Sequence, residues 1–291
     1  MKRAVLLIVP ATAAAVALAG CGSGSSGGNT ASVNSGGTTS QIAGCEPSTL
    51  HTLKSGVITI GADQPVYEPW YVNNDPTNGK GFEGAVSFAI AKELGYAPSQ
   101  IKVSRVTFDA AITPGPKSFD YDLDEFSITK AREKAVDFSA PYYDVTQAVV
   151  ALKGTKAAGV TTLAGLKSLK LAAQLGSTSA TAISDTIGTQ PATYTSNSDV
   201  LQALKNGQVD GVVVDLPTAF YMTSAQLKNG VIVGQLPQTS GQPEQFGALL
   251  PKGSPLTSCV SKAVDALRSS GQLAKIQDKW LAQAGNAPVL Q

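Results

Sequence analysis

Residues 118–143 have the types and spacing of an anion-binding site. Ser127 and Thr129 are hydroxyl residues at the expected end of a strand, and Arg132 follows three positions after Thr129. Thr129 is a good helix N-cap and residues 130–135 are good helix formers, so we expect a short helix with Arg132 in its first turn. The helix dipole disfavours a cation there, which indicates that Arg132 binds an anion. A solvated arginine beside ordinary strand-end hydroxyls is the alternative.

The segment in front of this motif carries a run of acidic residues. Three apolar residues alternate with three aspartates: Phe119, Tyr121 and Leu123 with Asp120, Asp122 and Asp124. This period of two predicts a half-buried β-strand. The aspartate spacing is also that of a calcium loop, but the sixth position, which needs glycine, is Glu125, and the twelfth, which needs glutamate, is Ala131. We therefore reject a calcium site.

The motif continues beyond the arginine. Ser127-Ile128-Thr129 and Arg132 are followed by Val136-Asp137-Phe138-Ser139 and then Pro141-Tyr142. Together these residues resemble the signature of the family 3 extracellular solute-binding proteins, the amino-acid receptors of ABC importers. The resemblance covers Val57 to Leu281, and it implies that Arg132 binds the α-carboxylate of an amino acid.

The resemblance implies further ligand contacts in the first part of the chain. Asp63 follows the buried strand Val57–Gly61, and its counterpart in the family contacts the ligand's side chain. Tyr67 corresponds to an aromatic residue that packs on the ligand, and Phe108 to one that lines the cleft. Trp70 lies in the same loop as Tyr67 and is either a ligand contact or a core residue that anchors the loop.

Two positions depart from the family pattern. Ala85 stands where an acidic residue is usual, so we expect a structural contact of the relatives to be absent. Glu125 stands where most relatives have a small residue whose backbone approaches the ligand. An acidic side chain at this point must alter the pocket.

A strand-to-helix turn in the middle of the chain is a second candidate for anion binding. Gly176, Ser177 and Thr178 form this turn, which alone is a weak signal. In the family the turn supplies amide and hydroxyl donors to the carboxylate that the arginine binds. The resemblance therefore assigns Ser177 and Thr178 to the ligand, with Gln174 facing the cleft.

Asp215 ends another buried strand, Val209–Val214. The corresponding aspartate of the family binds the α-ammonium group of the ligand. The alternative is that Asp215 caps the next helix, which has Pro217 in its first turn.

Strands that alternate with helices predict an α/β protein with mostly parallel sheets. Because the middle third is inserted between parts that belong together, we expect a two-lobed, type II periplasmic-binding-protein-like fold, with helices flanking each sheet and two crossover hinge strands. One lobe comprises residues 45–147 and 246–291, and the other comprises residues 148–245. Ligands of such folds bind at the carboxyl ends of strands. Four candidate residues end strands, two in each lobe: Asp63, Ser127, Gly176 and Asp215.

The first 44 residues have the pattern of an export signal and a tether. Lys2 and Arg3 precede an apolar run that is shorter than the about 20 residues needed to span a bilayer, so residues 1–20 predict a signal peptide. Leu18-Ala19-Gly20-Cys21 resembles a lipobox, so we expect Cys21 to be lipidated and to anchor the chain to the outside of the cell membrane. A chance cysteine is the alternative. Residues 21–44, rich in Gly, Ser and Thr, predict a flexible tether.

Composition excludes several classes of function. A net charge of +1 with dispersed basic residues argues against nucleic-acid binding. His51 is the single histidine, which excludes His/Cys zinc sites and Ser-His-Asp triads. In an exported protein with a lipidated Cys21, the remaining Cys45 and Cys259 should form a disulfide. We expect no cofactor, no metal and a monomer.

These observations predict a protein that captures a free L-amino acid and delivers it to an ABC importer permease. Asp63 and Glu125 add hydrogen-bond acceptors to the pocket, and no lysine or arginine beyond Arg132 maps to it. We therefore expect a polar uncharged or basic ligand. The alternatives are a sensor that reports to a separate signalling partner and a cyclohexadienyl-dehydratase-like enzyme, for which Glu125 is the one unusual acid or base.

Overall fold

The computed structural model describes residues 42–238, 243–282, 285 and 287–291. The expected signal peptide, Cys21 and residues 21–41 of the expected tether lie outside the described residues. Within the described part of the chain, no helix is long and apolar enough to cross a bilayer.

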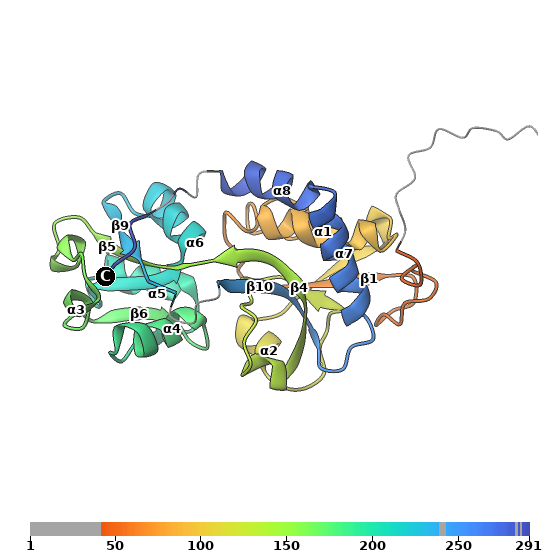
Figure 1. Ribbon diagram of the computed structural model, residues 1–291, viewed down its shortest axis with the longest axis horizontal. Coiled ribbons are helices and arrows are strands. Elements are labelled where there is room, and N and C mark those ends of the chain that lie inside the picture. The colour runs from red at the N-terminus through yellow and green to blue at the C-terminus, as the bar shows by residue number, and fades with distance from the viewer. Residues whose placement is uncertain (1–41, 239–242, 283–284, 286) are drawn as a thin grey trace, which may run out of the picture. The chain divides into compact units, whose positions relative to one another are not determined.

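The chain forms two five-stranded sheets (Figure 1). The first has the order β2-β1-β3-β10-β4: β1 (Ile58–Ala62), β2 (Ile101–Arg105), β3 (Tyr121–Asp122), β4 (Val136–Val145) and β10 (Glu244–Pro251). The second has the order β7-β6-β8-β5-β9: β5 (Gln147–Leu152), β6 (Leu171–Gln174), β7 (Ala192–Tyr194), β8 (Gly211–Asp215) and β9 (Gly230–Gln235).

Both sheets follow one pattern. The fourth strand in the order, β10 or β5, is antiparallel to both of its neighbours, and the other pairs are parallel. The chain enters the second sheet through β5, directly after β4, and returns to the first sheet through β10, after β9. The reversed strand of each sheet is therefore the one through which the chain enters that sheet. Four of the five strands in each sheet therefore run in one direction, as expected, and the reversed strand makes each sheet mixed. We propose that the lobes divide at these crossovers, as residues 45–147 with 246–291 and residues 148–245.

Helices flank each sheet. The first sheet is accompanied by α1 (Phe82–Glu93), α2 (Phe108–Ile112), α7 (Thr257–Ser269) and α8 (Gln272–Leu281). The second is accompanied by α3 (Leu163–Leu166), α4 (Thr178–Ala182), α5 (Asn197–Lys205) and α6 (Leu216–Tyr221). Short 3₁₀ helices cover Pro98–Gln100, Arg132–Lys134 and Lys156–Gly159, and π-helical turns extend α4 over Ile183–Ile187 and α6 over Met222–Gln226.

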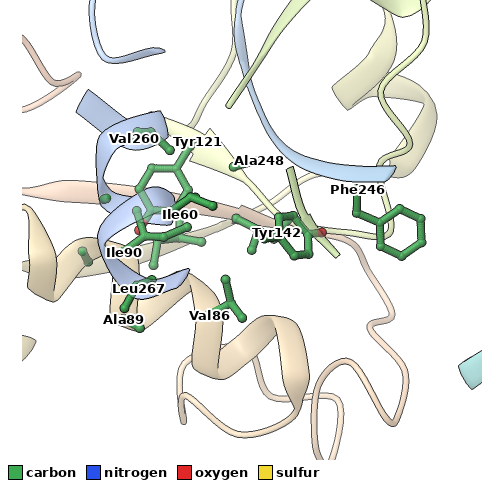
Figure 2. Close-up of a cluster of buried hydrophobic side chains, with 14 of the residues drawn as sticks. Ile60, Val86, Ala89, Ile90, Tyr121, Tyr142, Phe246, Ala248, Val260 and Leu267 are labelled. Carbon is green, nitrogen blue, oxygen red and sulfur yellow. The ribbon is translucent and has the colours of Figure 1, made fainter. Parts of the chain in front are cut away.

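The largest core lies between the first sheet and helices α1 and α7. Figure 2 shows Ile60 of β1 and Tyr121 of β3 beside Ile90 of α1 and Val260 of α7, and all four are nearly inaccessible to solvent. Burial of such side chains contributes about 1.5–3 kcal/mol each. This core fixes the backbone from which β1 and β3 extend to their carboxyl ends.

A disulfide joins Cys45 to Cys259, as expected. The two residues are 214 positions apart, and both are buried beside the first core. The bridge ties the start of the folded part of the chain to α7.

The acidic segment differs from the expected strand. Only Tyr121 and Asp122 pair as β3, and Asp120 and Asp122 are buried although alternation predicts one exposed face. Asp120 is buried because its carboxylate accepts the backbone N–H groups of Leu53 and Thr59, at 2.8 and 2.6 Å. A hydrogen-bonded role for the side chain thus overrides the simple pattern.

The helix expected after Thr129 is a single 3₁₀ turn over Arg132–Lys134. The Thr129 hydroxyl accepts the N–H of Arg132 at 3.1 Å, so its capping role is as expected. The helix is short because β4 begins at Val136 and its pairing with β10 fixes the following residues in an extended conformation.

The last described residues pack on the second sheet. Gln235 of β9 donates its backbone N–H to Pro288 and accepts that of Leu290, both at 2.8 Å, and Figure 1 shows the C-terminus beside this sheet. Leu290 is buried in the second sheet's core. A Cβ on Gly234 would lie 2.7 Å from Leu290, so this approach requires glycine. The chain therefore contacts the second sheet again after α8.

Candidate ligand-binding site

A small cavity opens where strands of both sheets end. Asp63 follows β1, Asp124 and Glu125 follow β3, Gln174 ends β6 and Asp215 ends β8. The residues that line the cavity are Asp63, Tyr67, Phe108, Asp124, Glu125, Arg132, Gln174, Ser177, Thr178, Ser179, Asn197, Val214 and Asp215. Carboxyl ends of strands are where ligands bind in open α/β sheets.

Nine of the eleven residues expected to contact a ligand line this cavity, and Trp70 and Ser127 do not. Sequence reasoning missed four lining residues: Asp124, Ser179, Asn197 and Val214. Asn197 could have been found, because it lies at the first turn of α5, just beyond the carboxyl end of β7.

Arg132 lies between the loop that contains Ser127, beside the first sheet, and the Gly176 turn that follows β6 of the second sheet. Its Nη1 donates to the carbonyl of Ser127 at 2.8 Å, and its Nη2 donates to the carbonyl of Gly176 at 3.0 Å. Burial lowers the pKa of this guanidinium, while Glu244 and Asp215 oppose that shift. A guanidinium has five N–H donors in a fixed plane, so donors remain for an anion in the cavity.

The turn after β6 supplies hydroxyl groups beside Arg132. Gly176 has a φ of 74°, a left-handed conformation that favours glycine. Ser177 caps α4 by accepting the N–H of Ala180 at 3.1 Å, and Thr178 lies within 3.1 Å of the Ser127 hydroxyl. We call Arg132, Ser177 and Thr178 the anion-binding group.

Four carboxyl groups also line the cavity, and we call them the acidic group: Asp63, Asp124, Glu125 and Asp215. Burial raises the pKa of Asp63. Burial and the neighbouring acids, Asp63 first among them, raise the pKa of Asp124 well above its usual range. One guanidinium therefore faces four acids in a poorly solvated space, an arrangement that a cation would stabilise.

Glu125 and Asp215 lie within hydrogen-bonding reach of each other, although they come from different sheets. Glu125 has a φ of 54°, and the Glu83 carboxylate accepts its backbone N–H at 2.8 Å. Burial and the charge of Asp215 raise the pKa of Glu125 well above its usual range. Burial, followed by the charge of Glu244, raises the pKa of Asp215 to about 8.

The sequence matches the family of bacterial extracellular solute-binding proteins, family 3, over residues 58–283. The chain belongs to this family. The arginine-binding extracellular protein ArtP of Bacillus subtilis is 27% identical to this family 3 protein. The match covers 96% of this chain and 98% of ArtP. The ABC transporter arginine-binding protein 1 of Escherichia coli is 28% identical over 77% of the chain and 89% of that protein.

A solved structure of an ancestral arginine-binding protein bound to arginine is similar to this family 3 protein, with a TM-score of 0.63. It is 30% identical and covers 77% of this chain and 98% of that chain. This likeness and the two sheets described above confirm the expected two-lobed type II fold.

In this family 3 protein, Trp70 and Ser127 lie behind the cavity wall. The indole N–H of Trp70 donates to the Thr218 hydroxyl at 2.7 Å, and Thr218 donates to Glu125 at 2.8 Å. Ser127 donates to the Glu244 carboxylate at 2.6 Å. Trp70 supports the lining residue Glu125 through Thr218, and the carbonyl of Ser127 accepts an N–H of the lining residue Arg132.

The ring of Phe108 supports Arg132 within the cavity wall. Phe126 stacks against Phe108 with 5.1 Å between ring centroids, and the Arg132 guanidinium carbon lies 5.3 Å from the Phe108 centroid. A cation over an aromatic face is stabilised by about 0.5–2 kcal/mol. Tyr67 is the other aromatic residue that lines the cavity.

Direct bonds between the two sides keep the cavity small. The space for water-sized molecules in it is about 30 Å³, enough for one or two waters. Arg132 is bonded to Gly176 of the other sheet's turn, and behind the cavity wall Thr218 is bonded to Glu125. A molecule of amino-acid size therefore needs these two sides to separate before it can enter.

Proposed function

We propose that this protein is an extracellular receptor that captures an L-amino acid between its two lobes. Arg132, with Ser177 and Thr178, binds the α-carboxylate, and Asp215 binds the α-ammonium group. The observation that carries the proposal is the convergence of a guanidinium and four carboxyl groups, drawn from both sheets, on one cavity. Opposite charges at a short separation match the zwitterionic end that all amino acids share.

The side chain of the ligand is basic. Apart from Asp215, three carboxyl groups line the cavity, and Arg132 is the one cationic side chain among the described residues that line it. An acidic ligand would add a like charge to this space, which costs several kcal/mol, whereas a guanidinium or ammonium group would be paired by Asp63 and Asp124. The arginine-binding relatives support this choice. A polar uncharged side chain, such as that of glutamine, is the second choice.

A thermal-shift screen of the purified protein against the twenty amino acids tests this function. A ligand present at one hundred times its Kd stabilises the protein by about 2.7 kcal/mol. We expect the largest shifts with arginine or lysine. Aspartate or glutamate as the best ligand would contradict the basic choice, and no shift with any amino acid would contradict the receptor function.

The captured amino acid is delivered to an ABC importer, and Cys21 carries the lipid that holds the receptor at the membrane. The lipobox-like sequence Leu18-Ala19-Gly20-Cys21 and the transporter relative support this step. Replacing Cys21 with serine should move the protein from the membrane fraction to the medium or leave it unprocessed. Unchanged membrane retention would contradict the anchor and would leave the binding function unaffected.

A further inference from the structure

The acidic group contains a pair of carboxyl groups that face each other across the two sheets. Glu125 follows β3 of the first sheet and Asp215 ends β8 of the second, and the two carboxyl groups line one cavity of about 30 Å³ within hydrogen-bonding reach of each other. Two carboxylates cannot hydrogen-bond to each other unless one of them carries a proton, because both are then acceptors only. The contact itself therefore requires a proton.

The neighbours of the pair direct that proton toward the contact between the two groups. The hydroxyl of Thr218 accepts a hydrogen bond from the indole N–H of Trp70, which can only donate. The same hydroxyl therefore donates a hydrogen bond to Oε2 of Glu125. The amide Nε2 of Gln147 donates a hydrogen bond to Oδ1 of Asp215, with 2.7 Å between the two atoms. One oxygen of each carboxyl group thus accepts a bond from a neutral donor, and the other oxygen of each group is available to share the proton.

The amide of Gln147 is itself held in this orientation. Its Oε1 accepts the hydroxyl proton of Ser179 at 2.6 Å, and its Nε2 also donates to Glu244 at 3.0 Å. Both amide hydrogens therefore go to carboxylates, one to Asp215 and one to Glu244. Rotating the amide would bring its oxygen against these two acids.

Most charged neighbours of the pair are acidic. Those that act on it from the packed elements are Glu83 of α1, Asp124 beside Glu125, Glu244 of β10, Tyr143 of β4 and Arg132. Arg132 is the single cation among them, and it already donates to two backbone carbonyls. A second negative charge on the pair would lie among acids, so this environment favours one proton over none.

We infer that Glu125 and Asp215 hold one proton between them in the ligand-free protein, and that the ammonium group of the ligand takes the place of this proton. This inference rests on the proposed function. In the exchange, the shared O–H bond breaks, the proton goes to solvent, and both carboxylates accept N–H bonds from the ammonium group. One proton leaves for each ligand bound, and no redox change occurs.

The exchange makes Glu125 a selectivity residue. Two carboxylates around the ammonium group require a ligand that is protonated there and has at least two N–H donors in that direction. An N-acetylated amino acid has one neutral N–H and cannot replace the proton, so it should not bind. The raised pKa of Asp215, about 8, agrees with a pair that is still protonated at neutral pH.

Binding should therefore weaken in acid. If one proton is released, the Kd rises about tenfold for each unit that the pH falls below the range where the pair loses its proton. Between pH 7 and pH 5 the ligand keeps its own charges, so we expect the Kd to rise by up to about a hundredfold. The Kd of a site that takes up a proton with its ligand would change with pH in the opposite direction.

Titration calorimetry with L-arginine at pH 7, in buffers of different ionisation enthalpy, counts the released protons. We expect about one proton per ligand for the unchanged protein and about none for the double variant Glu125→Gln with Asp215→Asn, which has no titrating group left in the pair. Glu133→Gln is the matched control, since Glu133 is a partly exposed acid paired with Lys130, and it should release as many protons as the unchanged protein. Infrared difference spectra should show the protonated carboxyl band disappear when ligand binds, except in the double variant.

The outcomes separate this inference from the function on which it rests. Binding by the unchanged protein with no proton release overturns the shared proton and keeps the receptor function. Equal release by the double variant Glu125→Gln with Asp215→Asn overturns the assignment to this pair. If the double variant does not fold, the proton count and the pH slope of the unchanged protein decide the matter. No binding of any amino acid overturns the receptor function and the exchange together.

Discussion

The anion-binding group has one charge, the guanidinium of Arg132, which two backbone carbonyls hold. The acidic group has four carboxyl groups, and two of them, Glu125 and Asp215, lie within reach of each other and accept hydrogen bonds from Thr218 and Gln147. The first group depends on short stretches of sequence, and the second depends on contacts between residues far apart in the chain. Loss of one member should therefore have different consequences in the two groups.

The largest effect is expected at Arg132, because no other cation lines the described part of the cavity. Arg132→Ala leaves the α-carboxylate without its charged partner, which costs about 2–5 kcal/mol. The Kd measured by calorimetry should rise at least about thirtyfold. Lys130→Ala, an exposed cation two residues away, is the control and should leave the Kd unchanged. Equal affinity of both variants would remove Arg132 from the site.

The second effect is expected at Glu83, a buried acid that is hydrogen-bonded to the backbone of Glu125. Glu83 accepts hydrogen bonds from the Glu125 backbone and the Tyr142 hydroxyl, and burial raises its pKa from 4.5 to about 7. The folded state therefore binds more protons than the unfolded state between about pH 4.5 and 7, so this residue makes stability fall as pH rises through that window.

Glu83→Gln should remove that loss. Between pH 4.5 and pH 7 the free energy of unfolding should fall by about 3 kcal/mol less in the variant than in the unchanged protein. Denaturant unfolding at several pH values measures both curves. Parallel curves would mean that Glu83 is ionised throughout the range.

The third effect contrasts the two groups directly. Asp215→Asn removes one charge of a pair, and Glu125 remains to face the ammonium group, so we expect the Kd to rise only about tenfold, or about 1.4 kcal/mol. Glu125→Gln combined with Asp215→Asn leaves no charge in the pair and should cost at least a further tenfold. A loss by Asp215→Asn as large as that of Arg132→Ala would mean that Glu125 does not contribute.

The same contrast separates what the sequence can predict from what it cannot. The position of Arg132 beside the Gly176 turn was predictable, because Arg132 lies five residues after Ser127 and the turn directly follows a strand. Such spacing fixes geometry locally. The placement of Asp124 was not predictable. Alternation sends neighbouring residues to opposite faces, but the left-handed φ of Glu125 ends the extended backbone, and both Asp124 and Glu125 reach the cavity.

Long-range contacts account for the other differences. Trp70 lies in an aromatic-rich loop, where sequence alone cannot distinguish a ligand contact from a core residue. Three rings, Phe82, Tyr143 and Phe246, surround it and decide the matter. The segment that ends with Leu290 has no periodic pattern, and its position depends on Gly234 and an available strand of the second sheet.

The smallest effect is expected at Thr218, which joins the acidic group to the core. Its hydroxyl connects the buried N–H of Trp70 to the lining residue Glu125, and so connects the two lobes, although Thr218 itself does not line the cavity. Thr218→Val keeps the shape of the side chain but leaves the Trp70 N–H without an acceptor, which costs about 1–3 kcal/mol of unfolding free energy.

Loss of this bond also removes a contact that the closed arrangement makes, so the ligand must supply more of the free energy of closure. The Kd should rise about fivefold, corresponding to about 1 kcal/mol. Thr218→Ser keeps the hydroxyl and should bind like the unchanged protein, which separates the hydrogen bond from the volume of the side chain. If Thr218→Val and Thr218→Ser give the same Kd, the hydrogen bonds of Thr218 contribute to the stability of the fold and not to ligand binding. The affinity of the acidic group for the ligand then depends only on the residues that line the cavity.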